Sequence, residues 1–386
     1  MPQWVKALLV GAPLLATAAL LKAAPVYSVT YLGKDSTIGI NDSGQVVGYT
    51  LSGGRDPSRA TLYSGTGTGN TDLGTLGGTS SAATKINNAG QIVGDAANAN
   101  NNRRATLFSG NGANNVDLGT LGGGTSMARG INSSGQVVGS AETSTGKNHA
   151  TLFSRNGTNN IDLGTLGGSY SFANDINNNG QVVGWSYTTG DEGVHAALFA
   201  ISGPNVDLGT LGGFNSAAYS LNNAGQAVGV ASTNSGYQHA TLFSGSGIGN
   251  IDLGTLFGGS TSSLAWDIND KGQVVGQARN PSFSAFAFLW SADMGMVALD
   301  DLLEPLSDWQ LSSAYGVNES GQISAFGCNL SIGCGAVLLS IVPGDPVSTS
   351  TPEPASLALF GTGLLGALFA TRKGRRRSMQ PTDQAI

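Results

Sequence analysis

Charged residues are what this sequence has least of. Only 11% of its 386 residues are Asp, Glu, Lys or Arg, against roughly 25% in ordinary soluble domains. Glycine, with 59 residues, and other small neutral residues fill the gap. A surface of small neutral polar groups is more typical of extracellular and envelope proteins than of cytosolic enzymes. The 40% apolar content, arranged in alternating runs, argues against a disordered chain.

Positive charge is scarcest in the middle of the chain. The net charge is −6, but seven of the 18 Lys and Arg residues lie in the two ends. The part between the ends keeps the other 11, together with 22 of the 24 Asp and Glu, and therefore carries a charge near −11. Such an acidic body repels phosphate backbones, so we expect no nucleic-acid partner.

Cysteine occurs only as Cys328 and Cys334. In an oxidising compartment the pair would clip a hairpin as a disulfide, and two free buried thiols are the alternative. No second Cys or His pair accompanies them, so we expect no metal site. We expect no cofactor either.

Histidine is also rare, and the sequence lacks the common signatures of nucleophilic catalysis. His149, His195 and His239 occupy the same place in successive repeats, which would spread them around a ring and favours structural roles. The chain has no Gly-x-Ser-x-Gly motif and no unique His beside a unique Ser or Cys. We therefore predict that the protein has no catalytic residues and is not an enzyme.

Residues 1–24 have the layout of a Sec signal peptide. Lys6 precedes an apolar stretch from Ala7 to Leu21, and the small residues Ala23 and Ala24 follow. We expect signal peptidase to cleave there, and an uncleaved anchor is the alternative. No Cys follows the apolar run, which excludes lipoprotein processing.

The C-terminal end combines a proline motif, an apolar segment and a basic cluster. A Pro/Ser/Thr linker over 343–351 leads into Pro352, Glu353, Pro354 and Ala355. We expect a short transmembrane helix over 357–371, whose uncharged residues span only about 21 Å of the ~30 Å hydrocarbon core. Directly after the helix come the basic residues Arg372, Lys373, Arg375, Arg376 and Arg377, and a polar tail follows over 378–386. The positive-inside rule keeps this cluster cytoplasmic and places the body outside.

This tail, over 352–377, resembles a PEP-CTERM sorting signal. The resemblance implies a substrate of an exosortase-type sorting enzyme in a Gram-negative bacterium that makes exopolysaccharide. It also implies a protein held in the inner membrane by the C-terminal helix before processing, and located in the cell envelope or outside the cell afterwards. Exopolysaccharide is then a further expected partner.

Between the ends, over 25–342, the sequence repeats itself about every 45 residues. DLGTL recurs at a constant spacing of 45, with its Asp at 72, 117, 162, 207 and 252. A hydrophobic-Asn-x-x-Gly-Gln motif recurs seven times, with its Asn at 41, 87, 132, 177, 222, 269 and 318. A third motif, like His-Ala-Thr-Leu-Phe, begins at Arg59, Arg104, His149, His195 and His239. The set resembles the HAF-type extracellular repeats.

Each repeat parses into four short strands, which is the size of one propeller blade. Asn-x-x-Gly is a turn between two strands, and seven such hairpins imply seven blades. The isolated strand near Tyr27 stands where the DLG strand of the last blade would lie. We therefore predict an all-β, seven-bladed β-propeller that the N-terminal strand closes, which would remove the exposed sheet edges. A β-solenoid is the alternative.

Several repeated residues are candidate sites. The recurrent DLG aspartates would line a channel and bind cations, or else make the same backbone hydrogen bonds between blades, and we favour the second reading. Asp175 to Gly180 matches the first half of a Ca²⁺ loop, but Ser186 stands where the bidentate acid is needed, so a hairpin turn is favoured. The segment from Asp267 to Gly272 is similar, but Lys271 would repel a cation. Gly65-x-Gly67-x-Gly69 is interpreted as a loop rather than a nucleotide cradle.

The largest break in the repeat runs from Asn280 to Gln310. Its acids and aromatic residues are Trp290, Asp300, Asp301, Glu304, Asp308 and Trp309. Such residues suit sugar binding or glycoside cleavage, but we favour a diverged blade. We predict a structural or interaction protein of the cell envelope, associated with exopolysaccharide. A lectin or glycan-active enzyme that uses the propeller face near Trp290 and Asp301 is the alternative.

Overall fold

The computed structural model describes residues 24–50, 58–65 and 68–343. The expected signal peptide up to residue 23, the sorting motif, the helix over 357–371, the basic cluster and the polar tail lie outside the described residues. Within those residues, no helix has both the length and the apolar character that a membrane span requires.

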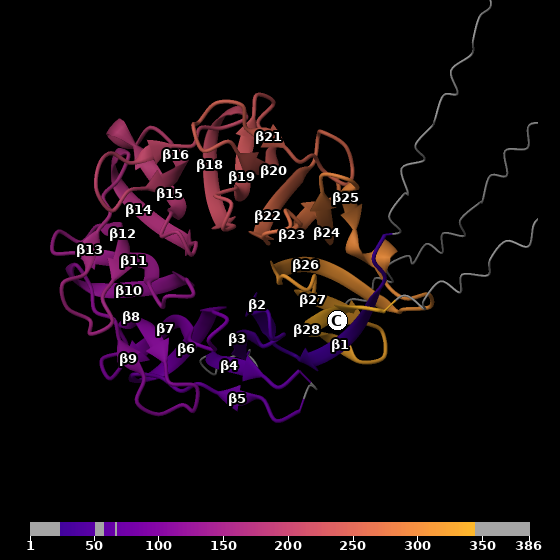
Figure 1. Cartoon of the computed structure of the whole chain (residues 1–386), viewed down its shortest axis with the longest axis horizontal. Helices are drawn as coiled ribbons and strands as arrows, with labels where there is room; N and C mark the ends of the chain where they lie inside the picture. Colours follow the sequence, from indigo (N-terminus) through magenta and orange to yellow (C-terminus); the bar gives the residue numbers. More distant parts are fainter. Residues whose placement is uncertain (1–23, 51–57, 66–67, 344–386) are drawn as a thin grey trace, which may run out of the picture. The chain divides into compact units, whose positions relative to one another are not determined.

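The described chain forms seven four-stranded antiparallel sheets, arranged as blades around a ring (Figure 1). This arrangement confirms the predicted seven-bladed β-propeller and excludes the solenoid. In six of the blades, four consecutive strands run from the centre of the ring to its outside. Each inner strand ends at the hydrophobic residue before the repeated Asn, and the Asn-x-x-Gly turn leads into the second strand.

The strands of the first three blades are β2 (Ser36–Ile40), β3 (Val46–Thr50), β4 (Arg59–Tyr63), β5 (Thr71–Asp72), β6 (Gly77–Ile86), β7 (Ile92–Asn98), β8 (Arg103–Phe108), β9 (Val116–Asp117), β10 (Gly122–Ile131), β11 (Val137–Thr143), β12 (Asn148–Phe153) and β13 (Ile161–Asp162). Blades 4 to 6 contain β14 (Gly167–Ile176), β15 (Val182–Thr188), β16 (Val194–Phe199), β17 (Val206–Asp207), β18 (Gly212–Leu221), β19 (Ala227–Thr233), β20 (Gln238–Phe243), β21 (Ile251–Asp252), β22 (Ser262–Ile268), β23 (Val274–Arg279), β24 (Ala285–Ser291) and β25 (Gly295–Ala298). Two short 3₁₀ turns, η1 (Thr189–Asp191) and η2 (Leu299–Leu302), lie in connections.

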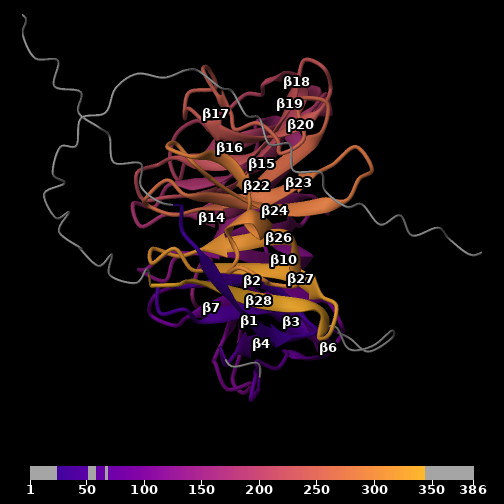
Figure 2. The same cartoon turned by 90° about the vertical axis from the view of Figure 1, so that its right-hand side faces the viewer.

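Blade 7 takes its strands from both ends of the described chain. It contains β26 (Trp309–Val317), β27 (Ile323–Asn329) and β28 (Gly333–Ile341), and β1 (Tyr27–Gly33) adds the outermost strand. Figures 1 and 2 show β1 beside β28, and Tyr27 pairs with Ile341 in the antiparallel register. The Val342 amide also donates to the Val26 carbonyl at 2.8 Å. The predicted closure by the N-terminal strand is confirmed.

A ring of seven asparagines explains the Asn-x-x-Gly-Gln motif. In each blade the Asn Nδ2 donates to the main-chain carbonyl of the equivalent Asn in the next blade, at 2.9–3.1 Å. The seventh bond runs from Asn318 back to Asn41, so the circle is complete. We call these residues the asparagine ring: Asn41, Asn87, Asn132, Asn177, Asn222, Asn269 and Asn318.

The Gln and Gly of the same motif complete the hydrogen bonds of each ring asparagine. The second Nδ2 hydrogen donates to the Gln Oε1 at 2.7–2.9 Å. The Asn Oδ1 accepts from the Gln amide, and the Asn carbonyl accepts from the Gly amide. The asparagines are only 3–5% exposed, and a buried polar group of this kind is costly unless it is bonded.

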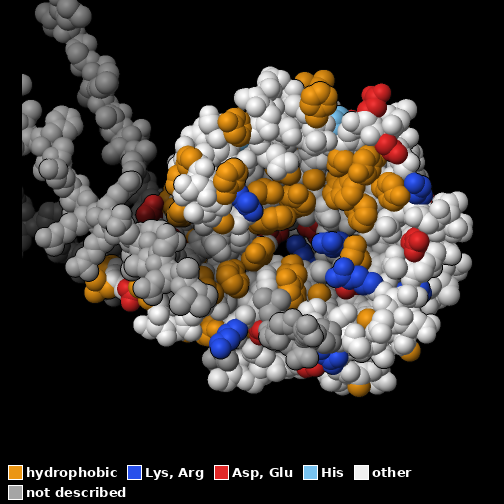
Figure 3. Space-filling view, turned by 180° about the vertical axis from the view of Figure 1, so that it is seen from behind, with side chains coloured by type: hydrophobic (Ala, Val, Ile, Leu, Met, Phe, Trp, Pro, Cys, Tyr) orange, Lys and Arg blue, Asp and Glu red, His pale blue; other side chains and the backbone are white. Residues whose placement is uncertain are grey.

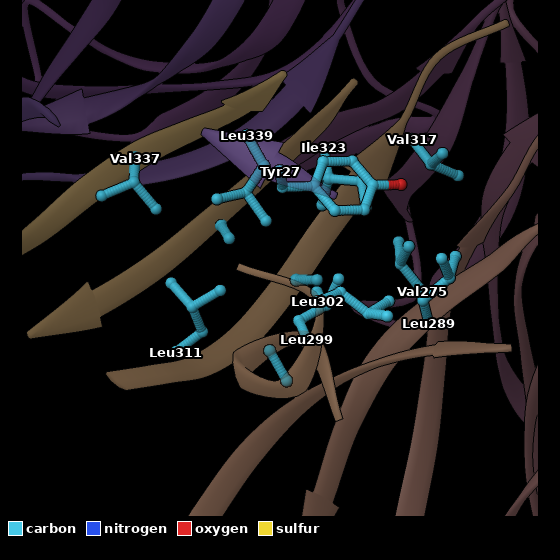
Figure 4. Packing of buried hydrophobic residues seen from close by; sticks show 13 residues of the cluster. Tyr27, Val275, Leu289, Leu299, Leu302, Leu311, Val317, Ile323, Val337 and Leu339 are labelled. Atoms are coloured by element: carbon cyan, nitrogen blue, oxygen red, sulfur yellow. The ribbon is translucent and has the colours of Figure 1, made fainter. Parts of the chain in front are cut away.

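Between the blades lie seven apolar clusters, each built from two neighbouring sheets. The cluster between blades 4 and 5 contains Leu208, the leucine of a DLG motif, and Phe243, the phenylalanine of the third motif. The cluster between blades 6 and 7 is the largest and contains Tyr27 of β1 (Figure 4). Burial raises the pKa of the Tyr27 hydroxyl to about 12. The N-terminal strand is therefore held by side-chain packing as well as by backbone pairing.

A glycine in the second strand of six blades has a steric cause. The inner strand opposite carries a β-bulge, which brings a carbonyl close to the second strand. A Cβ at Gly184 would lie 1.9 Å from the Phe172 carbonyl oxygen. The repeated Gly of the Val-Val-Gly sequence is therefore required by this close approach.

Cys328 and Cys334 form a disulfide with an S–S distance of 2.06 Å. They are directly opposed in the antiparallel pair β27–β28. The bond clips the hairpin of the blade that closes the ring.

Replacing one ring asparagine is expected to destabilise the whole propeller. Asn177→Ala removes both Nδ2 bonds and leaves the Gln181 amide without its buried acceptor. We expect a loss of about 2–4 kcal/mol in the free energy of unfolding, measured by urea denaturation. The control is Asn178→Ala, because the exposed Asn178 Oδ1 accepts only the Ser133 amide; it should cost less than about 1 kcal/mol. Equal losses for the two variants would contradict a special role of the ring.

Candidate functional site

The centre of the ring is closed by charged and polar side chains that lie two residues before the ring asparagines. Three blades have glycine at this position, at Gly39, Gly130 and Gly316. The other four contribute the channel floor, which we define as Lys85, Asp175, Ser220 and Asp267. The glycines leave room for these side chains, since a Cβ at Gly130 would lie 2.9 Å from the Cα of Asp175.

The channel floor is a connected network across four blades. The Lys85 Nζ lies 3.5 Å from Asp175 Oδ2 and 3.4 Å from Asp267 Oδ1. The Ser220 hydroxyl lies between the two acids, 3.0 Å from Asp175 and 2.6 Å from Asp267. Backbone amides of Leu221 and Val317 donate to the same carboxylates. The network therefore ties together blades that are not neighbours.

Burial and charge set the protonation of this network. Burial lowers the pKa of Lys85, but the charges of Asp175 and Asp267 outweigh it and hold the pKa above its ordinary value of 10.5. Burial also raises the pKa of Asp175, an effect that Lys85 opposes and Asp267 reinforces. Lys85 is thus a permanent cation at neutral pH that the two acids share.

The channel floor forms the bottom of a bowl of about 380 Å³ at the mouth that the asparagine ring encircles. Its rim consists of the residues that follow the ring asparagines: Asp42, Asn88, Ser133, Asn178, Asn223, Asp270 and Glu319. Most rim side chains accept from the backbone amide of the preceding blade, as Glu319 does from Asp270 at 2.7 Å. Burial, together with the charges of Asp270 and Asp42, raises the pKa of Glu319. The bowl thus offers amide and carboxylate groups to a polar or cationic ligand.

The recurrent aspartates of the DLG motif pair with the first residue of the third motif in the same blade. Arg59 and Arg104 bond Asp72 and Asp117, and the three histidines bond Asp162, Asp207 and Asp252 at 2.7–2.8 Å. The other Asp oxygen accepts the amide of the glycine two residues on. The aspartates thus make the same bonds in every repeat, but within the blade and its turn rather than between blades.

Besides the asparagine ring, further links between blades come from residues that the sequence analysis did not single out. The Asn115 side chain donates to the Leu73 carbonyl of the preceding blade at 2.7 Å, and Asn160, Asn205 and Asn250 repeat the bond. The Ser126 hydroxyl of blade 3 accepts the Ala105 amide of blade 2 at 2.9 Å. Both residues recur at a spacing of 45, and this periodicity is the signal that could have revealed them.

The segments that resemble a Ca²⁺ loop or a nucleotide cradle are turns in the structure. Asn177 belongs to the asparagine ring and Asp175 to the channel floor, and the Gly180 amide donates to the Asn177 carbonyl. Among the described residues, no three His, Cys, Asp or Glu side chains gather where a metal ion could be held. Gly65 and Gly69 have positive φ in a hairpin loop, and Gly67 lies outside the described residues.

The break from 280 to 310 is divided among several places. Trp290 packs in the cluster between blades 5 and 6, while Trp309 stacks on Tyr31, with 5.8 Å between ring centroids. Asp300 accepts the Leu311 amide at 2.8 Å, and burial raises its pKa. Asp300 and Asp301 do line a hollow of about 370 Å³, but its aromatic walls are Phe257 and Phe286. The two tryptophans are therefore not brought together with the acids.

The comparisons with known proteins identify the C-terminal signal. Residues 350–377 match the PEP-CTERM protein-sorting motif, two residues earlier than predicted. This motif implies an exported, cell-envelope protein and recognition by an exosortase-type enzyme. No curated protein sequence matches the chain.

A search of solved structures returned, among others, the crystal structure of Porphyromonas gingivalis dipeptidyl peptidase 4. That match has 10% sequence identity and a TM-score of 0.31, and covers 76% of this chain. The chain spans only 50% of the peptidase.

The shared lysine of the channel floor gives a pH-dependent prediction. Lys85→Met leaves Asp175 and Asp267 buried without their cation, which should cost about 3 kcal/mol of unfolding free energy at pH 7. Removing Lys85 also takes away the charge that lowers the pKa of Asp175, so this pKa rises further in the folded state and the folded variant takes up a proton as the pH falls. Its deficit relative to wild type should therefore shrink toward pH 4.

Urea denaturation at pH 7 and pH 4 measures this change. Lys271→Met is the matched control, because Lys271 is exposed and its Nζ donates to the Glu319 carbonyl, away from the channel floor. The claim that Lys85 neutralises both acids would be wrong if the loss in unfolding free energy for Lys85→Met were the same at both pH values, or no larger than the loss for Lys271→Met.

Proposed function

We propose that this chain is an exported cell-envelope protein that an exosortase-type enzyme sorts through residues 350–377, and that its propeller acts there as a non-catalytic structural or interaction module associated with exopolysaccharide. The observation that carries the proposal is the sorting motif after a compact propeller unit that ends at Val342. In this proposal the motif directs sorting, and the propeller is the part that remains in the envelope.

A structural role is supported by the side chains that could otherwise bind ligands or act in catalysis, because they bond one another. The described histidines and DLG aspartates bond one another, and the asparagine ring bonds itself. A rigid module of this kind presents loops and rim residues on a fixed frame.

Changing the sorting motif is expected to block processing. Glu353→Ala should leave the protein at its precursor mass in the inner-membrane fraction, whereas the wild type should lose its tail in cells that contain an exosortase. Immunoblotting of cell fractions, with and without the exosortase, measures both. Pro346→Ala, which lies outside the matched residues, should be processed like wild type. Identical mass and location for wild type and Glu353→Ala would overturn the sorting proposal.

A second candidate is a glycan-binding or glycan-active face near Trp290 and Asp301. The hollow beside Asp301 favours it, because two carboxylates lie next to Phe257 and Phe286, whose ring centroids are 4.9 Å apart. Two acids beside apolar walls are the arrangement that glycoside cleavage uses.

The enzymatic version of this candidate makes a direct prediction. If Asp301 takes part in cleavage, Asp301→Asn should abolish sugar release from a broad panel of polysaccharides, since an amide neither transfers a proton nor attacks. Asp308→Asn, in an exposed position of the same segment, should leave it unchanged. Absence of sugar release by the wild type, or unaltered release by Asp301→Asn, rules this candidate out. A glycan array then separates a lectin from an inert surface.

A further inference from the structure

The inner strand of every blade carries a β-bulge at the same position, three residues before the ring asparagine. The seven bulge positions hold six residue types, and only tyrosine occurs twice, whereas the ring asparagine that follows is the same in every blade. Going round the channel they form what we call the bulge ring: Ile38, Thr84, Arg129, Asn174, Tyr219, Trp266 and Tyr315. Bulges re-aim side chains and often lie beside binding sites. The same backbone position therefore presents a different side chain from almost every blade.

Three consecutive members of the bulge ring form an aromatic arc. Tyr219 and Trp266 have ring centroids 4.8 Å apart, and Trp266 and Tyr315 follow at 6.4 Å. All three side chains are half-buried, so part of each remains open to solvent. A second half-buried cluster in blade 4 contains Phe172 and Trp185, stacked at 4.3 Å.

Next to the arc lie an amide and an arginine. Asn174 donates its Nδ2 to the Ala218 carbonyl at 2.7 Å, which leaves its Oδ1 as an acceptor with no donor among the described residues. Arg129, one blade further, is exposed and has no hydrogen bond to a described residue. Its acidic neighbour Asp95 already pairs with Arg103. Two arginines beside one aspartate leave a net positive charge in a body that is otherwise acidic.

One face of the ring is hollowed at its centre (Figure 3). Figure 3 shows hydrophobic side chains gathered around the centre of one face of the ring, with Lys and Arg side chains beside them. The opposite mouth is the bowl lined by the asparagine ring and its polar rim. Along each inner strand the bulge residue comes directly before the channel-floor position, and the ring asparagine comes after it, so the bulge ring lies on the side of the channel floor that faces the mouth opposite the bowl.

We propose that this mouth binds an acidic polysaccharide through a uronate unit: Arg129 takes the carboxylate, Asn174 a sugar hydroxyl, and the arc of Tyr219, Trp266 and Tyr315 the apolar faces of neighbouring sugar rings. The proposal rests on the proposed function, since it supplies the ligand class for the interaction module. It places that ligand at the channel mouth and not beside Asp301.

The chemistry of the arc favours a saccharide over an acidic peptide. Flat aromatic surfaces beside a hydrogen-bonding amide match sugar rings, which present C–H faces and hydroxyl edges. A guanidinium binds a carboxylate through two parallel hydrogen bonds, which fixes its orientation. The order of cation, amide and three aromatics along one arc fits a chain of several sugar units.

The test is calorimetric titration of the purified full-length protein with oligogalacturonate and with its neutral methyl ester. The acid should bind saturably and the ester about tenfold more weakly, because the charge-assisted bond to Arg129 is lost. Arg129→Gln should weaken binding of the acid by a similar factor. Arg155→Gln is the matched charge control, since Arg155 bonds Ser134 in a hairpin turn of the opposite face, and it should bind like wild type.

The aromatic arc is tested by Trp266→Thr and Tyr315→Thr. Threonine already occupies this position in blade 2, as Thr84, so the backbone accommodates it, and unchanged thermal midpoints would verify folding. Each should weaken binding about fivefold or more, and Phe214→Thr, at an exposed aromatic outside the bulge ring, should not.

Four results would overturn the proposal: no saturable binding by the folded protein, equal affinity for acid and ester, unchanged affinity in Arg129→Gln, or unchanged affinity in both threonine variants. Polyglutamate that binds as tightly as the oligouronate would assign the mouth to an acidic peptide instead. The assay uses purified protein, so its result is independent of whether residues 350–377 direct sorting in cells.

Discussion

The structure depends on one closed circle of hydrogen bonds. Each ring asparagine uses its side-chain amide to hold its own hairpin and the next blade at once. Because one side chain makes both bonds, a distorted turn in one blade also breaks the hydrogen bond to the next blade. The apolar clusters between the blades supply most of the buried surface, but they are broad and tolerant of small shifts. The directional bonds of the circle fix the number of blades.

This constraint explains why the fold could be predicted from the sequence. The three residues of each turn have separate physical roles: the asparagine side chain donates twice, the glycine takes a positive φ, and the glutamine Oε1 accepts one of the asparagine hydrogens. They therefore recur at a fixed spacing, and counting them gives the number of blades. The closure was predictable from the same count of repeats. The last repeat lacks a fourth strand, and the isolated segment at Tyr27 was the one strand left to supply it.

The candidate sites were less predictable, because they arise between repeats and not within them. Lys85, Asp175 and Asp267 occupy equivalent positions in three repeats, so in the sequence they look like substitutions of one another. They come together only because the blades form a ring, in which the residues at this position of every blade face the same channel. The acids and tryptophans of the 280–310 segment show the opposite case. They are close in sequence, but Trp290 packs between blades 5 and 6, Trp309 packs between blades 6 and 7, and Asp301 is exposed.

The junction of β1 with β28 has a consequence for the order of events during export. The Ser28 side chain bonds a carbonyl that lies 312 residues further along the chain, so the last blade is a contact between the earliest and latest parts of the propeller. A chain delivered from its N-terminus cannot complete this blade until β28 has crossed, and long-range pairing of this kind forms slowly. The first strand must therefore wait unpaired through most of translocation. Because β28 ends at Ile341, directly before the sorting tail in the sequence, the ring closes only after almost the whole propeller sequence has crossed.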